Sequence, residues 1–366
     1  MILLLLIYRT FLRFFYFFIK LLPTKKSRIT FLSRQTNTPS IDFQYLIADI
    51  KSRYPECEIK VLCKRLEKDN VKQIVSYLFH PFMQMILLAT SEICIIDSYQ
   101  IAVSVLRHKK NLKIVQIWHS LAAIKKSGLA ALDSQKKRQI AKIMCMHKNY
   151  DFIAIGSEKM IEHFSKAFGY KAEKFWITGL PRVDYLLKTK DSNKILVQKT
   201  YPKLKNAKIV LYAPTFRKNN DYRFREIIEA FENTSYTLII KKHPLTKAEI
   251  PEKYEYKKLR TIELLSSADF VISDYSGTII EAAVAERPLL IFNYDNAEFA
   301  KNEGFFIDIE KEFQNLSFKN AGEIVSFIQK DDYDMSLLKK FCKKCIKNTN
   351  GNCTEDLTNK IMQLKK

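Results

Sequence analysis

Two histidines stand directly beyond stretches of sequence that predict buried strands. His119 follows the apolar run Lys113–Trp118, and His243 follows the run Tyr236–Ile240 after two lysines. Ligands of an open α/β sheet bind beyond the carboxyl ends of its strands. Histidine titrates near neutral pH and is the usual general base for a hydroxyl group. We therefore expect His119 to accept a proton and His243 to bind or protonate a phosphate oxygen. Taken alone, either histidine could equally be an ordinary packed or solvated side chain.

A third motif is a turn between a predicted strand and a predicted helix. Its residues are Ser273, Asp274, Tyr275, Ser276, Gly277 and Thr278. A helix N-terminus presents unpaired N–H groups and a partial positive charge, so it favours phosphate groups. The hydroxyls of Ser276 and Thr278 add donors, and Gly277 lets a ligand approach the backbone. The same residues could instead only cap the helix. Glu281 could accept hydrogen bonds from ribose hydroxyls, or it could belong to a capping box.

A fourth candidate is Arg217, which follows the predicted strand Lys208–Tyr212. A guanidinium group can bind phosphate through two parallel N–H groups. The alternative is an arginine on the surface with no ligand. Lys125 and Lys126 add positive charge shortly after His119. The sequence has neither the glycine-rich dinucleotide fingerprint nor a P-loop, so these two modes of nucleotide binding are not expected.

The elements that must hold these motifs alternate between short apolar runs and helix-like stretches. The predicted strands are Glu58–Cys63, Ile93–Ile96, Lys113–Trp118, Phe152–Ile155, Phe175–Thr178, Lys208–Tyr212, Tyr236–Ile240, Phe270–Ser273 and Pro288–Phe292. Helices are expected at Asp133–His147, Glu158–Phe168, Tyr222–Glu232, Thr278–Ala285 and Ala321–Gln329. Strands that alternate with helices predict doubly wound parallel sheets of the α/β class.

The length of 366 residues, 47% of them apolar, is enough for two domains with cores of their own. We place the boundary in the polar and basic stretch 188–207. The expected organisation is a membrane-interface anchor (1–28), an N-terminal Rossmann-like acceptor domain (29–190), a C-terminal Rossmann-like donor domain (205–335) and a basic helical tail (336–366). Two such halves facing one another across a cleft would bind ligands between them.

The charge of the chain is strongly unbalanced. Lys and Arg number 61 against 39 Asp and Glu, which gives a formal net charge of +22. Such a field favours anionic partners, namely nucleic acid, anionic lipid or a phosphorylated substrate. No aromatic-basic RNA signature occurs, and anionic lipid accounts for the charge equally well, so no nucleic-acid partner is predicted. The seven cysteines form no disulfide framework, which favours a reducing, cytoplasmic compartment.

The first 22 residues are strongly hydrophobic, but three cations interrupt them. At about 100° per residue, Arg9, Arg13 and Lys20 fall on one stripe of a helix with Tyr16. This pattern favours a helix in the membrane interface, with its cations towards the headgroups of an anionic cytoplasmic leaflet. A spanning helix would have to carry Arg9 and Arg13 through the bilayer core. The third alternative is an amphipathic helix buried within the fold.

Taken together, the stretches IWHSLAAIKKSG, ITGLPRVD, LYAPTFR, KKHP, VISDYSGTIIE and RPLLIFNYD resemble the CDP-glycerol glycerophosphotransferase family, the polymerases and primases of teichoic acid. The resemblance runs from about Lys113 to Asp308. Members are GT-B-like, peripheral membrane enzymes. They move glycerol phosphate or ribitol phosphate from a CDP-alditol to a hydroxyl of a polyprenyl-linked acceptor and release CMP. The chain departs from the family after His119 and at Gly277, and these departures touch the acceptor and donor loops.

The resemblance also implies roles for individual residues. His119 would be the base on the acceptor hydroxyl, and His243 would contact the donor pyrophosphate. The donor set would comprise Arg217, Ser273, Asp274, Ser276, Gly277 and Thr278, with Glu281 on the ribose. No cofactor and no metal site are expected, because the sequence has no Asp-rich metal motif. Histidine, arginine, lysine and a helix N-terminus would then stabilise the charge that phosphoryl transfer develops.

Three functions remain open from the sequence. The first is transfer of an alditol phosphate, preferably glycerol phosphate, from a CDP-alditol to a polyprenyl-linked acceptor at the cytoplasmic face of the cell membrane. The second is a glycosyltransferase of capsule or surface polysaccharide synthesis that uses a nucleotide sugar. The third is a basic, membrane-associated protein that binds nucleic acid or lipid, which would explain the charge but not the motifs at the strand ends. The sequence does not indicate an oligomeric state.

Overall fold

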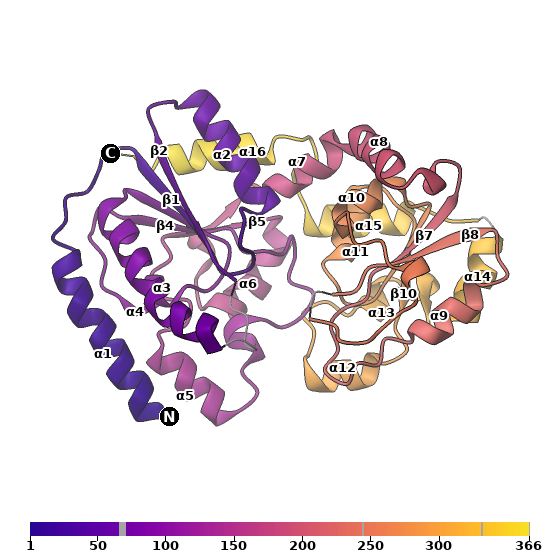
Figure 1. The fold of residues 1–366 in the computed structure, drawn as a ribbon, viewed down its shortest axis with the longest axis horizontal. Coiled ribbons are helices and arrows are strands. Elements are labelled where there is room, and N and C mark those ends of the chain that lie inside the picture. Colours follow the sequence, from indigo (N-terminus) through magenta and orange to yellow (C-terminus); the bar gives the residue numbers. More distant parts are fainter. Residues whose placement is uncertain (66–70, 244, 331, 366) are drawn as a thin grey trace. The chain divides into compact units, whose positions relative to one another are not determined.

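The computed structural model describes residues 1–65, 71–243, 245–330 and 332–365. Its internal contacts divide the chain into two compact units, both of the α/β class (Figure 1). Unit 1 comprises Met1–Leu121, Lys126–Asp184 and Asn350–Lys366. Unit 2 comprises Ala122–Lys125 and Tyr185–Thr349. The two candidate histidines therefore belong to different units, His119 to unit 1 and His243 to unit 2.

Unit 1 is built on a six-stranded sheet in the order β2-β1-β3-β4-β5-β6, in which every pair is parallel. The strands are β1 (Arg28–Ser33), β2 (Glu58–Cys63), β3 (Ile93–Ile96), β4 (Lys113–Gln116), β5 (Phe152–Ile155) and β6 (Phe175–Ile177). All residues of β1 and β3 are buried, as expected of a parallel sheet covered on both faces. The strand order reverses between β1 and β3, where a doubly wound sheet opens a crevice for ligands.

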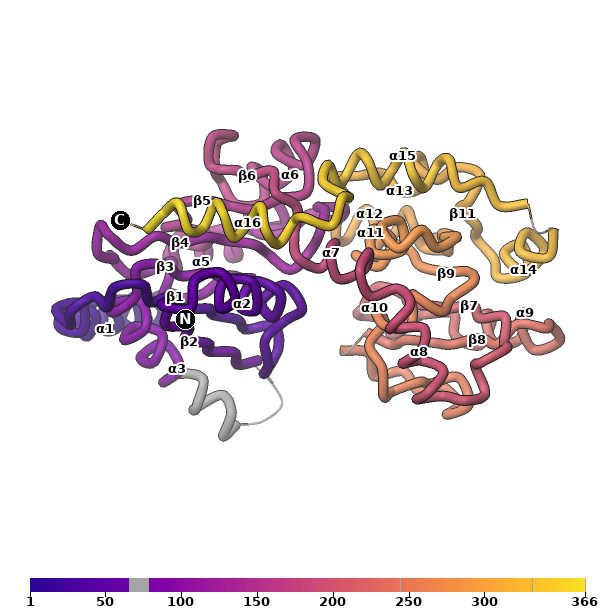
Figure 2. Tube along the Cα trace, turned by 90° about the horizontal axis from the view of Figure 1, so that it is seen from above, coloured from indigo at the N-terminus to yellow at the C-terminus, as the bar shows by residue number. Residues whose placement is uncertain are grey.

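The helices of unit 1 are α1 (Ile2–Ile19), α2 (Ile41–Arg53), α3 (Val71–Thr90), α4 (Ile101–Val105), α5 (Gln135–Ile143), α6 (Ile161–Phe168), the start of α7 (Pro181–Lys188) and α16 (Cys353–Met362). The C-terminal helix α16 lies beside α2, although about 300 residues separate them in the sequence (Figure 2). The buried carboxylate of Asp184 accepts the N–H groups of Cys353 and Thr354 at 3.0 and 2.7 Å. This contact holds the first turn of α16 on unit 1.

Unit 2 has a five-stranded parallel sheet in the order β11-β10-β9-β7-β8. Its strands are β7 (Lys208–Tyr212), β8 (Tyr236–Ile240), β9 (Phe270–Ser273), β10 (Leu289–Phe292) and β11 (Ser317–Phe318). Its helices are α8 (Lys190–Thr200), α9 (Phe224–Phe231), α10 (Thr261–Leu264), α11 (Thr278–Val284), α12 (Asn296–Asn302), α13 (Ile309–Glu312), α14 (Ala321–Gln329) and α15 (Ser336–Cys345). The carboxyl ends of β7, β8 and β9 carry Arg217, His243 and the Ser273–Thr278 turn.

The α/β class with parallel sheets is confirmed, and each predicted strand exists. Three strands are shorter than expected, because β4 already ends at Gln116, β6 ends at Ile177 and β10 begins only at Leu289. Trp118 has a φ of 56°, which is not an extended conformation. The sequence did not predict β1 or β11.

The compact units differ from the expected domain limits, and two of the differences are that Ala122–Lys125 belongs to unit 2 and that α1 is part of unit 1. The boundary falls after Asp184, inside α7, rather than in the stretch 188–207. Most of that stretch is α8, a helix whose inward-facing Asn193 and Val197 are buried while its charged face is exposed. Its polar composition therefore reflects a solvated helix face and not a linker. The tail also divides, with α15 in unit 2 and α16 in unit 1.

Helix α1 exists, but its expected orientation is wrong. The cationic stripe faces unit 1, where Arg9 Nη1 donates to Ile143 O at 2.7 Å and Arg13 Nε donates to Val105 O at 2.8 Å. These carbonyls belong to the last residues of α5 and α4, where unpaired carbonyl groups and the negative end of the helix dipole attract cations. The apolar stripe is consequently the exposed one. In the described part of the chain, α1 is the one helix whose length and composition would allow it to cross a membrane.

Candidate active site

The ring of His119 is held by a backbone carbonyl at the edge of the unit 1 sheet. His119 Nδ1 lies 3.1 Å from the carbonyl oxygen of Asp97, which directly follows β3. A carbonyl oxygen can only accept a hydrogen bond, so Nδ1 carries the proton of the neutral ring. Nε2 is then the basic nitrogen, and the side chain is exposed to solvent. This tautomer is the one that a general base requires.

The backbone before His119 is in a conformation that a bulky residue rarely adopts. Trp118 has a φ of 56°, and such a residue costs about 1–3 kcal/mol unless its surroundings stabilise it. The buried Gln116 Oε1 accepts the Trp118 N–H at 2.7 Å. The Trp118 ring packs against the rings of His119 and Phe168, with centroids 4.2 and 5.0 Å apart. These contacts hold the turn that presents the histidine.

A buried ion pair between Arg182 and Asp42 also stabilises the turn that carries His119. Arg182 Nε and the Arg182 backbone N–H each donate a hydrogen bond to the Asp42 carboxylate at 2.8 Å. Arg182 Nη2 donates to the same carboxylate. Asp42 is 1% exposed. Arg182 Nη1 donates to the carbonyl oxygen of His119 at 3.2 Å. The sequence contains this arginine in the motif ITGLPRVD, but no role for it could be deduced there, because Asp42 is 140 residues away.

Asp97 contributes a buried acid beside the histidine. Its side chain is 2% exposed, and Ser98 Oγ donates to Oδ1 at 2.9 Å. Within the described residues, Oδ2 has no hydrogen-bond partner. Burial raises the pKa of Asp97 to about 6, and Ser33 and Ser98 partly oppose this rise. The sequence analysis did not single out this residue, since a lone Asp after an apolar run carries no distinctive signal.

In unit 2, Asp274 joins the loop after β7 to the turn after β9. Its carboxylate accepts the Thr215 N–H at 2.9 and 3.0 Å and the Tyr275 N–H at 2.6 Å. It also pairs with Arg217 Nη1 at 2.6 Å. Ser273 Oγ donates to the carbonyl oxygen of Ala213 at 2.8 Å, which adds a second link between the same two segments. Asp274 and Ser273 are both fully buried, and these contacts fix the two loops.

Arg217 makes different contacts from those that its sequence position indicated. Its guanidinium group binds the Asp295 carboxylate in a bidentate contact, in which Nε donates to Oδ2 at 2.6 Å and Nη2 donates to Oδ1 at 2.9 Å. Nη1 donates to Asp274 and to the Thr215 carbonyl. Burial alone would lower the pKa of Arg217, but Asp274 and Asp295 hold that pKa above its ordinary value. The bidentate face is therefore occupied by a carboxylate from the FNYD motif, to which the sequence analysis gave no role.

The remaining donor candidates lie around the N-terminus of α11. Ser276 Oγ accepts the Thr278 N–H at 3.3 Å and donates to Thr278 Oγ1 at 3.2 Å. The N-cap of α11 is Gly277, and within the described residues no side chain forms the N-cap hydrogen bond of the alternative interpretation. Gly277 is exposed and has a φ that any residue adopts, and no atom of the described residues lies within 4 Å of a Cβ placed there. The backbone at Gly277 thus has open space in front of it. Thr278 is buried, and Glu281 lies half-buried in the first turn.

His243 lies in an exposed position beyond β8. Its Nδ1 accepts the Leu245 N–H at 3.2 Å, which puts the proton of the neutral ring on Nε2. The tautomer is thus the opposite of that of His119, and it supplies an N–H donor rather than a base. The ring centroid is 5.5 Å from that of Phe216, the neighbour of Arg217. Pro244, which follows in the KKHP motif, lies outside the described residues.

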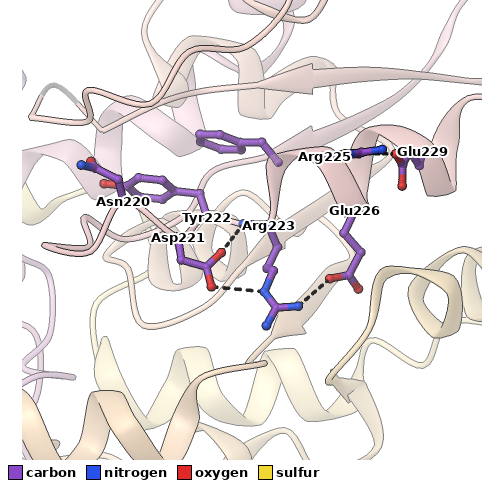
Figure 3. A pocket seen from close by; sticks show the side chains of 8 residues that line it. Asn220, Asp221, Tyr222, Arg223, Arg225, Glu226 and Glu229 are labelled. Atoms are coloured by element: carbon purple, nitrogen blue, oxygen red, sulfur yellow. Dashed lines mark hydrogen bonds and ion pairs between the residues drawn. The ribbon is translucent and has the colours of Figure 1, made fainter.

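A pocket of about 390 Å³ at the start of α9 contains none of the predicted site residues (Figure 3). Its lining includes Asp221, Arg223, Arg225, Glu226 and Glu229. These charges pair with one another, since Arg223 bonds both Asp221 and Glu226, and Arg225 bonds Glu229.

The structure brings together the candidates of unit 2 at the carboxyl ends of β7, β8 and β9, whereas His119 lies at the carboxyl edge of the sheet of unit 1.

Comparison with known proteins gives a consistent result. The family model for CDP-Glycerol:Poly(glycerophosphate) glycerophosphotransferase matches residues 14–363. The teichoic acid poly(ribitol-phosphate) polymerase of Bacillus spizizenii strain W23 is 26% identical over 95% of this chain and 58% of its own length. The teichoic acid glycerol-phosphate primase of Bacillus subtilis strain 168 is 28% identical over 78% of this chain and 77% of its own. The chain therefore spans somewhat over half of that polymerase.

Among solved structures, the wall teichoic acid polymerase TagF in a crystal soaked with CDPG has a TM-score of 0.74 to this chain. The sequences are 16% identical, and the match covers 97% of this chain and 93% of that chain. At this identity the likeness establishes the fold alone.

Proposed function

Because the chain belongs to the CDP-glycerol:poly(glycerophosphate) glycerophosphotransferase family, we propose that it transfers an alditol phosphate from a CDP-alditol to a hydroxyl of a lipid-linked acceptor of the cell envelope. Glycerol phosphate is the alditol that we expect, and CMP is the product that leaves. The observation that carries this proposal is the contact between His119 Nδ1 and the Asp97 carbonyl, which makes Nε2 the basic nitrogen of an exposed side chain.

The proposed reaction needs one proton transfer and one displacement at phosphorus. His119 Nε2 takes the proton of the acceptor hydroxyl, and the acceptor oxygen forms a bond to the phosphorus that bears the alditol. The bond from that phosphorus to the oxygen bridging the two phosphates breaks, and this oxygen leaves with CMP. Positioning and charge stabilisation supply most of the rate in such reactions. General base catalysis typically contributes about 10²–10⁴-fold.

The negative charge that develops on the departing CMP must be stabilised by unit 2. His243 Nε2–H, the backbone N–H groups near Gly277 and the hydroxyls of Ser276 and Thr278 are the groups that we assign to the donor phosphates. Glu281 is assigned to the ribose. The support for this assignment is that the residues lie at the carboxyl ends of β8 and β9, where parallel sheets bind nucleotides. Ser273, Asp274 and Arg217 fix the loops that hold this set.

We also propose that α1 and α3 together bind a membrane surface at its cytoplasmic face. The rings of Phe11 and Phe15 on α1 pack against Phe82 of α3, with centroids 5.9 and 5.5 Å apart. Around this contact both helices expose large apolar side chains, namely Leu3, Leu4, Phe14, Phe17 and Phe18 on α1, with Phe79, Met83 and Ile86 on α3. An exposed apolar face of this extent is typical of a membrane or protein interaction site.

The charges beside this apolar face favour an anionic bilayer as the partner. Helix α5 packs against α1 and exposes Lys136, Lys137, Arg138 and Lys142. Basic residues near a membrane surface contribute about 1 kcal/mol each when the leaflet is anionic. The bonds from Arg9 and Arg13 to α5 and α4 also tie α1 to unit 1 along its length. These bonds support a helix that lies in the interface and oppose one that spans the bilayer.

The reaction is tested by measuring CMP release from the purified protein with a lipid-linked acceptor in anionic micelles. CDP-glycerol, CDP-ribitol and several nucleotide sugars are offered separately. We expect acceptor-dependent release of CMP from a CDP-alditol. His119→Ala should lower the rate about 10²–10⁴-fold, whereas His163→Ala on α6 should retain it. Turnover of a nucleotide sugar, with none of either CDP-alditol, would instead establish the glycosyltransferase function.

Membrane binding is tested by sedimentation with vesicles of anionic and of neutral lipid. Phe14→Ser with Phe17→Ser removes two side chains that are 60% and 62% exposed. Since a buried Phe contributes about 1.5–3 kcal/mol, binding to anionic vesicles should weaken more than about tenfold. The matched control is Ile195→Ser, at an apolar position of α8 that is 65% exposed. Equal binding by both variants would contradict the proposed surface.

A further inference from the structure

The charges around Arg217 add up to a negative cluster rather than a positive one. Arg217 carries one positive charge, and Asp274 and Asp295 pair with it at 2.6 Å each. With both carboxylates ionised, these three groups have a formal charge of −1. Such a cluster by itself repels a diphosphate, because like charges in a partly buried site interact strongly. The donor site of unit 2 therefore needs a cation other than Arg217.

Lys125 is a cation of unit 2 that comes from an unexpected part of the sequence. It lies only six residues after His119, yet the segment Ala122–Lys125 belongs to unit 2. Lys125 forms an antiparallel bridge with Phe305, and the N–H groups of Phe306 and Ile307 donate to the Ile124 carbonyl at 2.8 and 3.2 Å. The backbone that carries Lys125 is thereby fixed to unit 2.

The ammonium group of Lys125 shares an aromatic neighbour with Arg217 but, within the described residues, forms no ion pair with Asp274 or Asp295. Lys125 Nζ and Arg217 Cζ each lie 5.9 Å from the ring centroid of Phe299. Within the described residues, no carboxylate oxygen lies within 4.0 Å of Lys125 Nζ. Burial lowers the pKa of Lys125, while Asp274 and Glu303 raise it and Arg217 lowers it, so the charges of the cluster act on this ammonium. Lys125 is half-buried.

We propose that Lys125 binds the diphosphate of the nucleotide donor, in the role that the sequence indicated for Arg217. This inference rests on the proposed function and names a further substrate-binding residue of that site. A lysine ammonium has three N–H donors and acts as a compact point charge, which suits phosphate oxygens. In this arrangement Arg217 shapes the loop and Lys125 supplies the charge. The single stretch 119–125 then carries both the proposed base and a ligand of the donor.

The competing role for Lys125 is purely structural, as a charge that offsets the carboxylates of Asp274 and Asp295. The two roles differ in what a ligand does. A structural lysine changes the stability of the protein and leaves the affinity for CDP unaltered. A phosphate ligand changes the affinity for CDP and the KM for the donor, and leaves kcat less affected.

The first experiment measures the binding of CDP by calorimetry to the full-length protein and to Lys125→Met, with Lys126→Met as the matched control. Lys126 is the exposed neighbour of Lys125 and belongs to unit 1. A charged hydrogen bond contributes enough that its loss should weaken binding about 10- to 100-fold, with a matching rise in the KM for the donor. Lys126→Met should bind as the parent protein does, and Lys125→Arg should recover most of the affinity.

A second measurement needs no variant and so does not depend on folding. Lysines of the parent protein are acetylated with a limiting reagent in the presence and absence of CDP, and modification is read by mass spectrometry. CDP should protect Lys125 and leave Lys126 unprotected. Unchanged affinity of Lys125→Met, or equal labelling of Lys125 with and without CDP, overturns the inference alone. A parent protein that binds no CDP overturns the proposed function as well.

Discussion

The two strand-end sites hold their key residues by opposite means. In unit 1, His119 is oriented by the neutral carbonyl of Asp97, and its ring is exposed. In unit 2, Arg217 is 4% exposed and all three of its nitrogens bond to carboxylates or a carbonyl. A base has to leave one nitrogen accessible to its substrate, and the Asp97 carbonyl orients His119 through the other nitrogen, Nδ1. A guanidinium held on every side is a structural element.

The comparison also explains why the burial of a charged residue says little about its chemistry. A buried ion pair often contributes little net stability, because desolvation offsets the attraction, yet removal of one partner leaves an uncompensated charge. Substitutions in the Arg217 network should therefore lower the free energy of unfolding strongly. Substitutions of the residues that position His119 should instead lower the rate of the reaction. Asp274 and Arg182 are the residues at which these two responses can be compared.

The largest effect on stability is expected from Asp274→Ala. The change removes the partner of Arg217 Nη1 and leaves the N–H groups of Thr215 and Tyr275 without their acceptor. Loss of one member of a buried pair costs about 3–5 kcal/mol in the free energy of unfolding. Denaturant unfolding measures this loss, and Asp191→Ala at an exposed site of α8 is the control. A loss below 1 kcal/mol (the order of an exposed pair) would remove the contrast between the two sites.

The strand ends and the candidate histidines could be predicted from the sequence because the signals are local. A run such as Ile93–Ile96 predicts a buried strand by composition alone, and residues that follow such runs must lie at the same edge of a parallel sheet. The partner of Arg217 is not local, since Asp295 lies 78 residues away and follows a different strand. The sequence shows that both residues exist, but the fold decides that they pair.

The predicted orientation of α1 was wrong for a related reason. The spacing of Arg9, Arg13 and Tyr16 correctly predicts one polar stripe, but a helical pattern does not show which face meets the protein. The answer depends on the free carbonyls at the ends of α4 and α5, which accept from these arginines. The sequence analysis placed helix-like residues at α5 but did not predict α4, so these acceptors could not be foreseen.

The next effect should come from Asp97→Asn and should depend on pH. Burial raises the pKa of Asp97 to about 6 in the folded protein, against an ordinary value of 3.8. The folded state thus binds the proton more tightly, and its stability falls as pH rises from about 4 through 6. At roughly 1.4 kcal/mol per pKa unit, Asp97→Asn should be more stable than the parent at pH 7 by on the order of 2–3 kcal/mol.

Unfolding at pH 4, 5, 6 and 7 measures this difference. His80, His108 and His147, whose pKa burial lowers to about 4, make both proteins less stable as pH falls and cancel in the comparison. CMP release should stay within about threefold, a change below 1 kcal/mol, because the backbone carbonyl that orients His119 is unchanged. Equal stability of the two proteins across this range would show that the Asp97 side chain does not carry the raised pKa.

A smaller effect, on rate, is expected from Arg182→Lys. The lysine keeps the charge that pairs with Asp42 but loses the fork that also reaches the His119 carbonyl. Slight misplacement of the base should lower kcat about tenfold and leave the KM for the donor unchanged. Arg53→Lys, which affects an exposed pair with Asp49, is the control. A rise in KM with normal kcat would assign Arg182 to substrate binding instead of to the position of His119.

The smallest effect should come from Gln35→Ala, and it tests the tautomer on which the base depends. Gln35 Nε2 lies 3.4 Å from His119 Nδ1, while the Asp97 carbonyl oxygen lies at 3.1 Å. If the glutamine amide donated to Nδ1, the ring proton would be on Nε2 and His119 could not accept a proton there. Because the closer carbonyl can only accept, we expect the glutamine to matter little, with kcat lowered less than about threefold. A loss of about 10²-fold or more, the size of a lost general base, would show that Gln35 sets the tautomer and would remove the contrast with His243.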